Sequence, residues 1–93
     1  MARKFKYRVY AIEEIIKDGQ PTGQGGDDHH LSVFATETSA LKWAKAVSFK
    51  KNLLGMDKPV LNIWVRCDHE DEDDDRVENW FIKDGIIESH DCG

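Results

Sequence analysis

The stretch that decides the fold reads Val60-Leu-Asn-Ile-Trp-Val-Arg-Cys67, and further along the chain comes Val77-Glu-Asn-Trp-Phe-Ile-Lys83. In the first segment apolar and polar side chains alternate with the period of two that is typical of a half-buried strand. After the second segment, Asp84-Gly85 followed by Ile86-Ile-Glu88 supplies the strongest short-range signal for a hairpin. These residues predict three strands, the last two joined by a tight turn.

The N-terminal segment predicts a further strand that has one apolar and one basic face. Its apolar-face residues are Phe5, Tyr7, Val9 and Ala11, and they alternate with Lys4, Lys6, Arg8 and Tyr10. We expect this strand to continue through Ile16. Asp18-Gly19 then predicts a turn, and the polar, Gly-rich sequence around it predicts a flexible loop or a wide hairpin end over about residues 18–30. Leu31 to Ala35 predict a short second strand.

Helix signals follow that second strand. Thr36-Glu-Thr-Ser39 supplies N-cap residue types, and Gly55 is a residue type common just past a helix C-terminus. We therefore predict a helix from about Ser39 to Leu54. The apolar arc expected to face the sheet comprises Trp43, Ala46, Val47, Leu53 and Leu54, with Ala40 and Ala44 on its margin. Leu41 and Phe49 are expected to point elsewhere.

The length and composition are those of one small globular domain over residues 1–93. The chain is 40% hydrophobic and 33% charged, which allows a modest core and excludes a two-domain enzyme. The order of elements predicts the α+β class, with one helix packed on a mainly antiparallel sheet in the order β-β-α-β-β-β.

Charge is distributed unevenly along the chain. Residues 1–60 carry ten Lys/Arg and seven Asp/Glu, whereas residues 61–93 carry three and eleven. The acidic end argues against direct binding of nucleic acid or of an anionic membrane. No apolar run reaches the roughly 18 residues of a membrane span, and the N-terminal sequence lacks the apolar core of a signal peptide. We therefore expect a soluble, cytoplasmic protein.

Seven carboxylates occupy the eight positions from 68 to 75. Unpaired charges are costly to bury, so this run predicts a solvated acidic loop over residues 68–75. The candidate partner-binding carboxylates are Asp68, Glu70, Asp71, Glu72, Asp73, Asp74 and Asp75. The alternatives are that the run only keeps the protein soluble, or that it neutralises the protein's own basic strand.

Two Cys/His pairs are candidate metal ligands. Cys67 and His69 form one pair, and His90 and Cys92 form the other, and four such ligands can surround a tetrahedral zinc. The second pair falls in residues 89–93, which we expect to be a frayed tail. The alternatives are a buried strand cysteine beside a loop histidine, or a disulfide between Cys67 and Cys92 in an oxidising setting. Zinc is the single cofactor that the sequence suggests.

The sequence contains no catalytic signature. Cys67 with His69 is the best available pair of nucleophile and base, but the neighbouring carboxylates would raise the pKa of the thiol and disfavour the thiolate. Without a catalytic or nucleotide-binding motif, a domain of this size is expected to be a non-enzymatic binding module.

In size, in the acidic run from Asp68 to Asp75 and in the lack of an enzyme motif, the chain resembles the small acidic proteins by which phages and mobile elements block host defence nucleases, anti-CRISPR proteins included. The resemblance implies an inhibitor in the host cytoplasm. Its carboxylate surface would imitate a nucleic-acid backbone and occupy the basic channel of a nucleic-acid-binding protein. The alternatives are a zinc-binding structural or regulatory protein, and a subunit of a larger assembly in which Phe49, Leu41 and Trp64 or Trp80 form an apolar interface.

Phe49 is a separate candidate for partner binding. It lies off the predicted apolar arc, so a regular helix would leave its ring on the surface, where it is available to a partner or to a second copy in a homodimer. The alternative is that Phe49 covers a strand edge or a loop of its own subunit.

Overall fold

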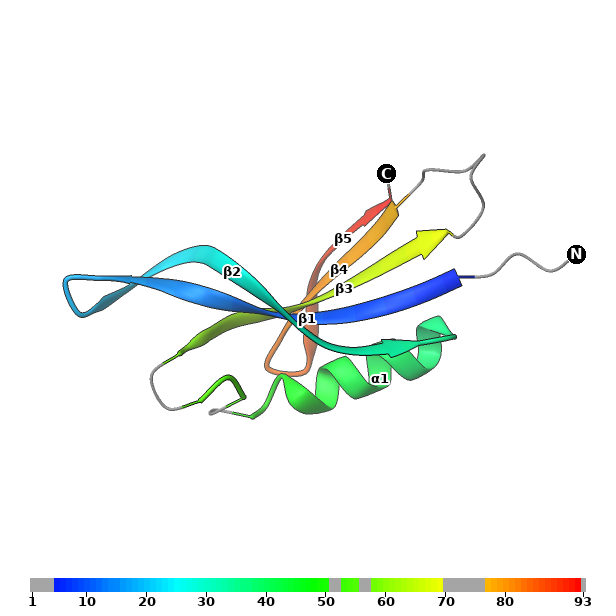
Figure 1. The fold of residues 1–93 in the computed structure, drawn as a ribbon, viewed down its shortest axis with the longest axis horizontal. Coiled ribbons are helices and arrows are strands. Elements are labelled where there is room, and N and C mark those ends of the chain that lie inside the picture. Colours follow the sequence, from blue (N-terminus) through cyan, green and yellow to red (C-terminus); the bar gives the residue numbers. More distant parts are fainter. Residues whose placement is uncertain (1–4, 51–52, 56–57, 70–76, 93) are drawn as a thin grey trace, which may run out of the picture.

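The computed structural model describes residues 5–50, 53–55, 58–69 and 77–92. Its elements are β1 (Phe5–Lys17), β2 (Gln20–Phe34), α1 (Glu37–Val47), β3 (Val60–His69), β4 (Val77–Lys83) and β5 (Ile86–Cys92), as shown in Figure 1. The strands form one sheet in the order β2-β1-β3-β4-β5, and each neighbouring pair is antiparallel. The fold is therefore one helix on a five-stranded antiparallel sheet, which confirms the predicted α+β class.

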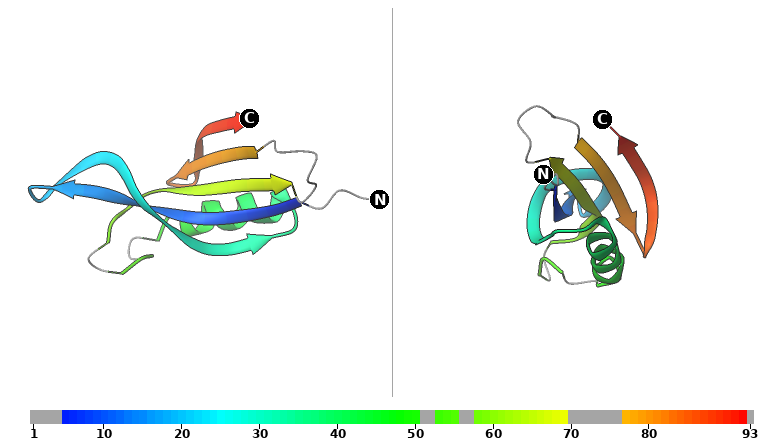
Figure 2. Two further views of the ribbon diagram at one scale, coloured as in Figure 1. Left: turned by 45° about the horizontal axis from the view of Figure 1, so that its top comes forward. Right: turned by 90° about the vertical axis from the view of Figure 1, so that its right-hand side faces the viewer.

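The hydrophobic core lies between α1 and one face of the sheet, and Figure 2 shows the helix on one side of the curved strands. The buried residues of this core are Val9, Ala11, Ala40, Ala44, Val47, Ile63, Val65, Cys67, Trp80 and Ile82. On β1, β3 and β4 they occupy alternate positions, because successive side chains of a strand point to opposite faces of the sheet. The predicted alternation in β1 and β3 is confirmed.

Helix α1 begins earlier and ends earlier than the sequence predicts. Thr36 is the N-cap, and its Oγ1 accepts a hydrogen bond from the Ser39 backbone N–H at 3.3 Å. The helix ends at Val47 rather than at Leu54: the Ser48 N–H still bonds to the Ala44 carbonyl, but the Phe49 and Lys50 N–H groups bond to carbonyls three residues back. The Ser48 Oγ accepts a hydrogen bond from the Gly85 N–H in the β4–β5 turn. No helix in the described ranges is both long and apolar enough to cross a membrane.

The side of α1 that contacts the sheet also differs from the predicted arc. Its buried residues are Ala40, Ala44 and Val47. Trp43 packs at the margin of the core, where its ring centroid lies 5.5 Å from that of Phe34. Leu41, which was expected to point elsewhere, packs against the core on the same helix. The predicted arc was rotated because it included residues beyond Val47 that are not helical.

Two tight turns join neighbouring strands. Asp84 and Gly85 have φ values of 52° and 77°, and Asp18 and Gly19 have 54° and 76°. In both turns the flanking residues pair directly, so each loop has two residues with positive φ, as in a type I′ turn. The predicted Asp84-Gly85 hairpin is confirmed, and the Asp18-Gly19 turn is a second hairpin of the same kind.

Strand β2 replaces most of the loop that the sequence predicts over about residues 18–30. The Gly-rich segment pairs with β1 through a ladder with several register shifts. Side chains support this irregular ladder: Thr22 Oγ1 donates to the Ile15 carbonyl at 2.6 Å, and the Gly23 N–H donates to Glu14 Oε2 at 2.9 Å. The prediction of a flexible loop is wrong here, and the alternative of a hairpin is the one that fits. Glycine content alone does not reveal bonds of this kind.

Strand β5 replaces the predicted frayed tail over residues 89–93. The chain pairs with β4 as far as Cys92, and Ser89 lies opposite Phe81 while Asp91 lies opposite Asn79. The prediction of a frayed tail is therefore wrong for the described residues, because the backbone there has a strand to pair with.

Candidate functional site

The candidate site is the face of the sheet opposite α1, which we call the open face. Its central side chains come from β1, β3 and β4 and are Arg8, Tyr10, Trp64, Arg66, Asp68, Asn79 and Phe81. The register places Arg8 opposite Arg66 and Tyr10 opposite Trp64. Within the described part of the chain, no helix lies on this face (Figure 2).

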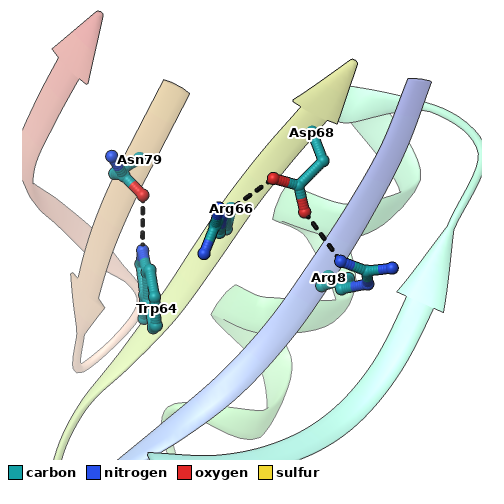
Figure 3. Close-up of polar contacts among 5 residues, drawn as sticks. All are labelled: Arg8, Trp64, Arg66, Asp68 and Asn79. Atoms are coloured by element: carbon teal, nitrogen blue, oxygen red, sulfur yellow. Dashed lines mark hydrogen bonds and ion pairs between the residues drawn. The ribbon is translucent and has the colours of Figure 1, made fainter. Parts of the chain in front are cut away.

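Aromatic rings form a row across the open face. The ring centroid of Trp64 lies 4.8 Å from that of Tyr10 and 6.3 Å from that of Phe81, with interplanar angles of 29° and 7°. The Trp64 indole N–H donates to Asn79 Oδ1 at 2.8 Å (Figure 3). At the β2 end, His30 meets Tyr10 edge-on at 5.3 Å. This row crosses four strands at positions that a strand in water usually fills with polar residues.

An ion-pair network lies beside the aromatic row. Asp68 Oδ2 accepts from Arg8 Nη1 at 2.9 Å, and Asp68 Oδ1 accepts from Arg66 Nε at 2.8 Å (Figure 3). The sequence placed Asp68 in the acidic loop as a partner-binding carboxylate, but it belongs to β3 and its side chain is only 19% exposed. Both of its oxygens are bound within the protein, so its direct role is to hold the two guanidinium groups.

The other candidate carboxylates, Glu70, Asp71, Glu72, Asp73, Asp74 and Asp75, lie outside the described residues. The connection between β3 and β4 contains them, so the run begins directly after the end of β3. Asp68 lies on the open face, so in the sequence these six carboxylates come shortly after a residue of the candidate site.

Phe49 lies where the end of α1 meets the β4–β5 turn. Its side chain is 64% exposed, as the sequence predicts, and its ring lies over Gly85, where an added Cβ would come within 2.4 Å of it. The ring therefore covers part of a turn in its own subunit, which was the alternative to partner binding. The binding role of Phe49 stays a prediction.

Cys67 is a core residue of β3. It is 2% exposed, and the Tyr7 hydroxyl donates a hydrogen bond to it. Burial raises the pKa of the Cys67 thiol, with Glu78 and Asp68 adding to the effect, so the neutral thiol is favoured. Strand β4 lies between β3 and β5, which puts the Cα atoms of Cys67 and Cys92 roughly 9.6 Å apart. A disulfide tolerates about 7 Å at most, so the two cysteines are not placed to form one.

The remaining candidate metal ligands are divided among different surroundings. His90 stacks on Trp80 with ring centroids 4.8 Å apart, and its Nε2 lies 3.1 Å from Glu78 Oε2. His69 and Cys92 are strand residues whose side chains lie outside the description. Among the described side chains, no three His, Cys, Asp or Glu groups are gathered as a metal site requires. Zinc binding stays a prediction.

The aromatic row as a whole was not predicted from the sequence, although Trp64 was a candidate for an apolar interface. Tyr10 and Trp64 each sit on the polar side of an alternating strand, and an aromatic residue at such a position is a signal for a binding surface. Periodicity assigns each ring to a face, but only the register between strands shows that the rings are neighbours.

Comparison with known proteins adds no relative. No family model matches the chain, and no match was found among curated proteins or among solved structures. The class defined by the fold is that of a small α+β domain with a helix on one face of an antiparallel sheet and the other face open.

Proposed function

We propose that this chain is a non-enzymatic protein-binding module that docks the open face of its sheet on a partner. The observation that carries the proposal is the row of Tyr10, Trp64 and Phe81 on the open face of the sheet. Tyr, Trp and Arg are the residues most enriched at the energetic centres of protein interfaces, which have a polar rim. The aromatic row, with Arg8 and Arg66 beside it, has this composition.

The geometry favours a protein partner over a nucleic acid. Bases stack on exposed ring faces, whereas Trp64 uses its ring against Tyr10 and Phe81, with planes close to parallel. Phosphate groups require available cations, whereas Arg8 and Arg66 both bond to one carboxylate of the same chain. The open face thus offers an apolar ridge beside a partly neutralised polar network, which suit a protein surface.

The acidic run indicates that the surface of the proposed partner is basic. All six positions between His69 and Arg76 carry a carboxylate, so the run should attract a basic surface over a Debye length of about 10 Å. A basic surface of that kind is typical of nucleic-acid-binding proteins. The proposal is therefore an inhibitor, encoded by a phage or mobile element, that occupies a nucleic-acid channel in the cytoplasm of the host.

The test starts with capture of the partner by the tagged protein and its purification. Trp64→Thr and Phe81→Thr should each weaken the affinity for this partner by more than tenfold, because truncation at an interface centre costs about 2 kcal/mol or more. The partner should also lose its bound nucleic acid as wild-type protein is added. Isothermal calorimetry and a nucleic-acid displacement assay provide both measurements.

Ala46→Ser is the matched control, since Ala46 is exposed on α1 away from the open face. Circular dichroism and thermal melting confirm that each variant is folded before binding is compared. Equal affinities for wild type and both folded open-face variants would refute docking by this face. If the partner keeps its nucleic acid in the complex, the proposal that this protein is an inhibitor of nucleic-acid binding is refuted.

A further inference from the structure

The β1–β2 hairpin extends past the rest of the sheet as a two-stranded arm. Pairing of β1 with β3 ends where Glu13 meets Val60, with one more bond from the Glu14 N–H to the Pro59 carbonyl. Beyond that point β1 and β2 pair only with each other in the described chain, as far as Lys17 and Gln20. Figure 1 shows this arm projecting away from α1, and the molecule is 52 Å long but only 22 Å and 20 Å across.

The arm is held in one shape by its own side chains. The Thr22 hydroxyl donates to Ile15 and accepts from the Gln24 N–H at 3.2 Å, and the Glu14 carboxylate accepts from Gly23. These bonds fix the ladder at its irregular points, where an isolated hairpin in water is at best marginally stable. A stiff arm loses little conformational entropy when it binds.

Apolar side chains and a hollow give the arm a binding surface. Ile15 and Ile16 are 41% and 44% exposed, although the arm has no core in which to bury them. At the base of the arm is a hollow of about 470 Å³, and its lining includes Glu13, Asp27 and Ile15. Glu13 Oε1 lies 3.4 Å from His29 Nε2 of the same chain, so Asp27 is the lining carboxylate placed for the charged head of a lysine or arginine. The aliphatic wall suits the methylene stem of that side chain.

We infer that the arm enters a cleft of a basic protein and that the hollow at its base receives an arginine or lysine side chain of that partner. Residues 13–28 carry five carboxylates and one lysine, so the arm complements a positively charged cleft. A two-stranded ribbon also fits the major groove of DNA, but these charges would repel phosphates. The inference rests on the proposed function, to which it adds a second contact separate from the open face.

The experiment is an NMR titration of the ¹⁵N-labelled protein with hexa-arginine amide, and with a thymidine hexanucleotide in parallel. The peptide should shift the backbone amide signals of Glu13, Ile15 and Asp27. Asp27→Asn should weaken its binding at this site about two- to fivefold, which is the usual range for one exposed ion pair. The matched control is Asp91→Asn, which removes an exposed carboxylate from β5 and should leave the arm shifts unchanged.

Peptide-induced shifts confined to the acidic run, or no shifts at the arm, would overturn the inference. It would also be overturned if the hexanucleotide shifted the arm signals, or if the signals of Ile15 and Ile16 changed with protein concentration alone, which would indicate a second copy on the arm. The outcome is distinct from that of the open-face test. An arm that binds the peptide while Trp64→Thr keeps full partner affinity would keep the arm as a contact for basic groups and remove docking by the open face.

Discussion

The Ser48 hydroxyl joins the end of α1 to the β4–β5 turn: its Oγ accepts a hydrogen bond from the Gly85 N–H at 2.8 Å. The same hydroxyl donates to the Lys45 carbonyl at 2.7 Å, so it satisfies one group of the helix end and one group of the turn. Phe49, the next residue, places its ring over Gly85. Helix and hairpin are thus connected by two successive side chains at a corner of the core.

Replacement of Gly85 by alanine should destabilise the protein for two reasons, backbone strain and a clash with Phe49, and a control variant separates their costs. Its φ of 77° costs an L-residue about 1 to 2 kcal/mol, and a Cβ would lie 2.4 Å from the Phe49 ring, which must then move. Gly19→Ala is the matched control, because Gly19 has a φ of 76° with no atom within 4 Å of an added Cβ. Urea unfolding should show a larger loss for Gly85→Ala, and equal losses would mean that Phe49 moves at no cost.

This corner also explains why the helix was predicted too long. The segment after Val47 has apolar residues at helical spacing and a glycine at the expected end, so its local sequence favours continuation. After Ser48 the backbone hydrogen bonds of Phe49 and Lys50 reach back three residues instead of four, and the Ser48 hydroxyl bonds to Gly85, 37 residues away in the chain. A contact of that kind is tertiary, and no local pattern predicts it.

Local sequence and tertiary context also differ in what they predict for a repeated segment. Ile-Lys-Asp-Gly occurs at residues 16–19 and at residues 82–85, and both copies form equivalent turns. After Asp84-Gly85 the apolar pair Ile86 and Ile87 indicates a strand, and the prediction is confirmed. After Asp18-Gly19 the glycine-rich sequence does not indicate a strand, although strand β2 begins at Gln20. Gly25 and Gly26 are suited to it because Ile12 and Ile15 lie against them, so close that a Cβ would come within 2.8 Å and 3.2 Å of those side chains.

Trp43→Ala should destabilise the protein by about 2 to 3 kcal/mol. A buried tryptophan is worth about 3 to 5 kcal/mol, but Trp43 is partly buried at the core margin, against Phe34, so less area is lost. Lys42→Ala on the exposed side of the same helix is the control and should change stability by less than about 0.5 kcal/mol. A Trp43→Ala protein as stable as the control would show that the ring contributes nothing to the packing of α1.

Stability should fall in alkaline solution because of Tyr7. Burial, together with the hydrogen bond to Cys67, raises the pKa of Tyr7 from 10.0 to about 12. Between these values the unfolded chain loses the phenolic proton and the folded chain keeps it. The contribution of Tyr7 is therefore complete below pH 10 and is lost as the pH rises through about 12. Urea unfolding from pH 9 upward should show a steeper decline for wild type than for Tyr7→Phe, and parallel curves would contradict the shift.

The candidate site was less predictable than the fold, because it depends on register. Alternation in β1 and β3 correctly separates the core side from the side with Tyr10 and Trp64. Asp68 was assigned to the loop by its charge, although the ladder continues past it and opposes it to Lys6 on β1. A carboxylate between Arg8 and Arg66 is a structural residue, and only the cross-strand distances distinguish it from the free charges that follow in the sequence.

The acidic run should act through the rate of association rather than through the fold. The test variant neutralises Glu70, Asp71, Glu72, Asp73, Asp74 and Asp75 as Gln or Asn, and it keeps Asp68 because both of its oxygens are bound to arginines. Its melting temperature should equal or exceed that of wild type, since removing adjacent like charges relieves repulsion.

Stopped-flow association with the purified partner should be slower for this variant at low salt. Electrostatic steering weakens as salt shortens the screening length, from about 10 Å at 0.1 M to about 3 Å at 1 M. The wild-type rate should therefore fall steeply with salt, the variant rate should hardly change, and the two should converge at high salt. Asp68→Asn is the contrasting variant: it should lower the melting temperature by releasing Arg8 and Arg66, yet keep a steep salt dependence. If the neutralised variant associates as fast as wild type at every salt concentration, the acidic run only keeps the protein soluble. The carboxylates of the β1–β2 arm would then be the groups that recognise a basic partner.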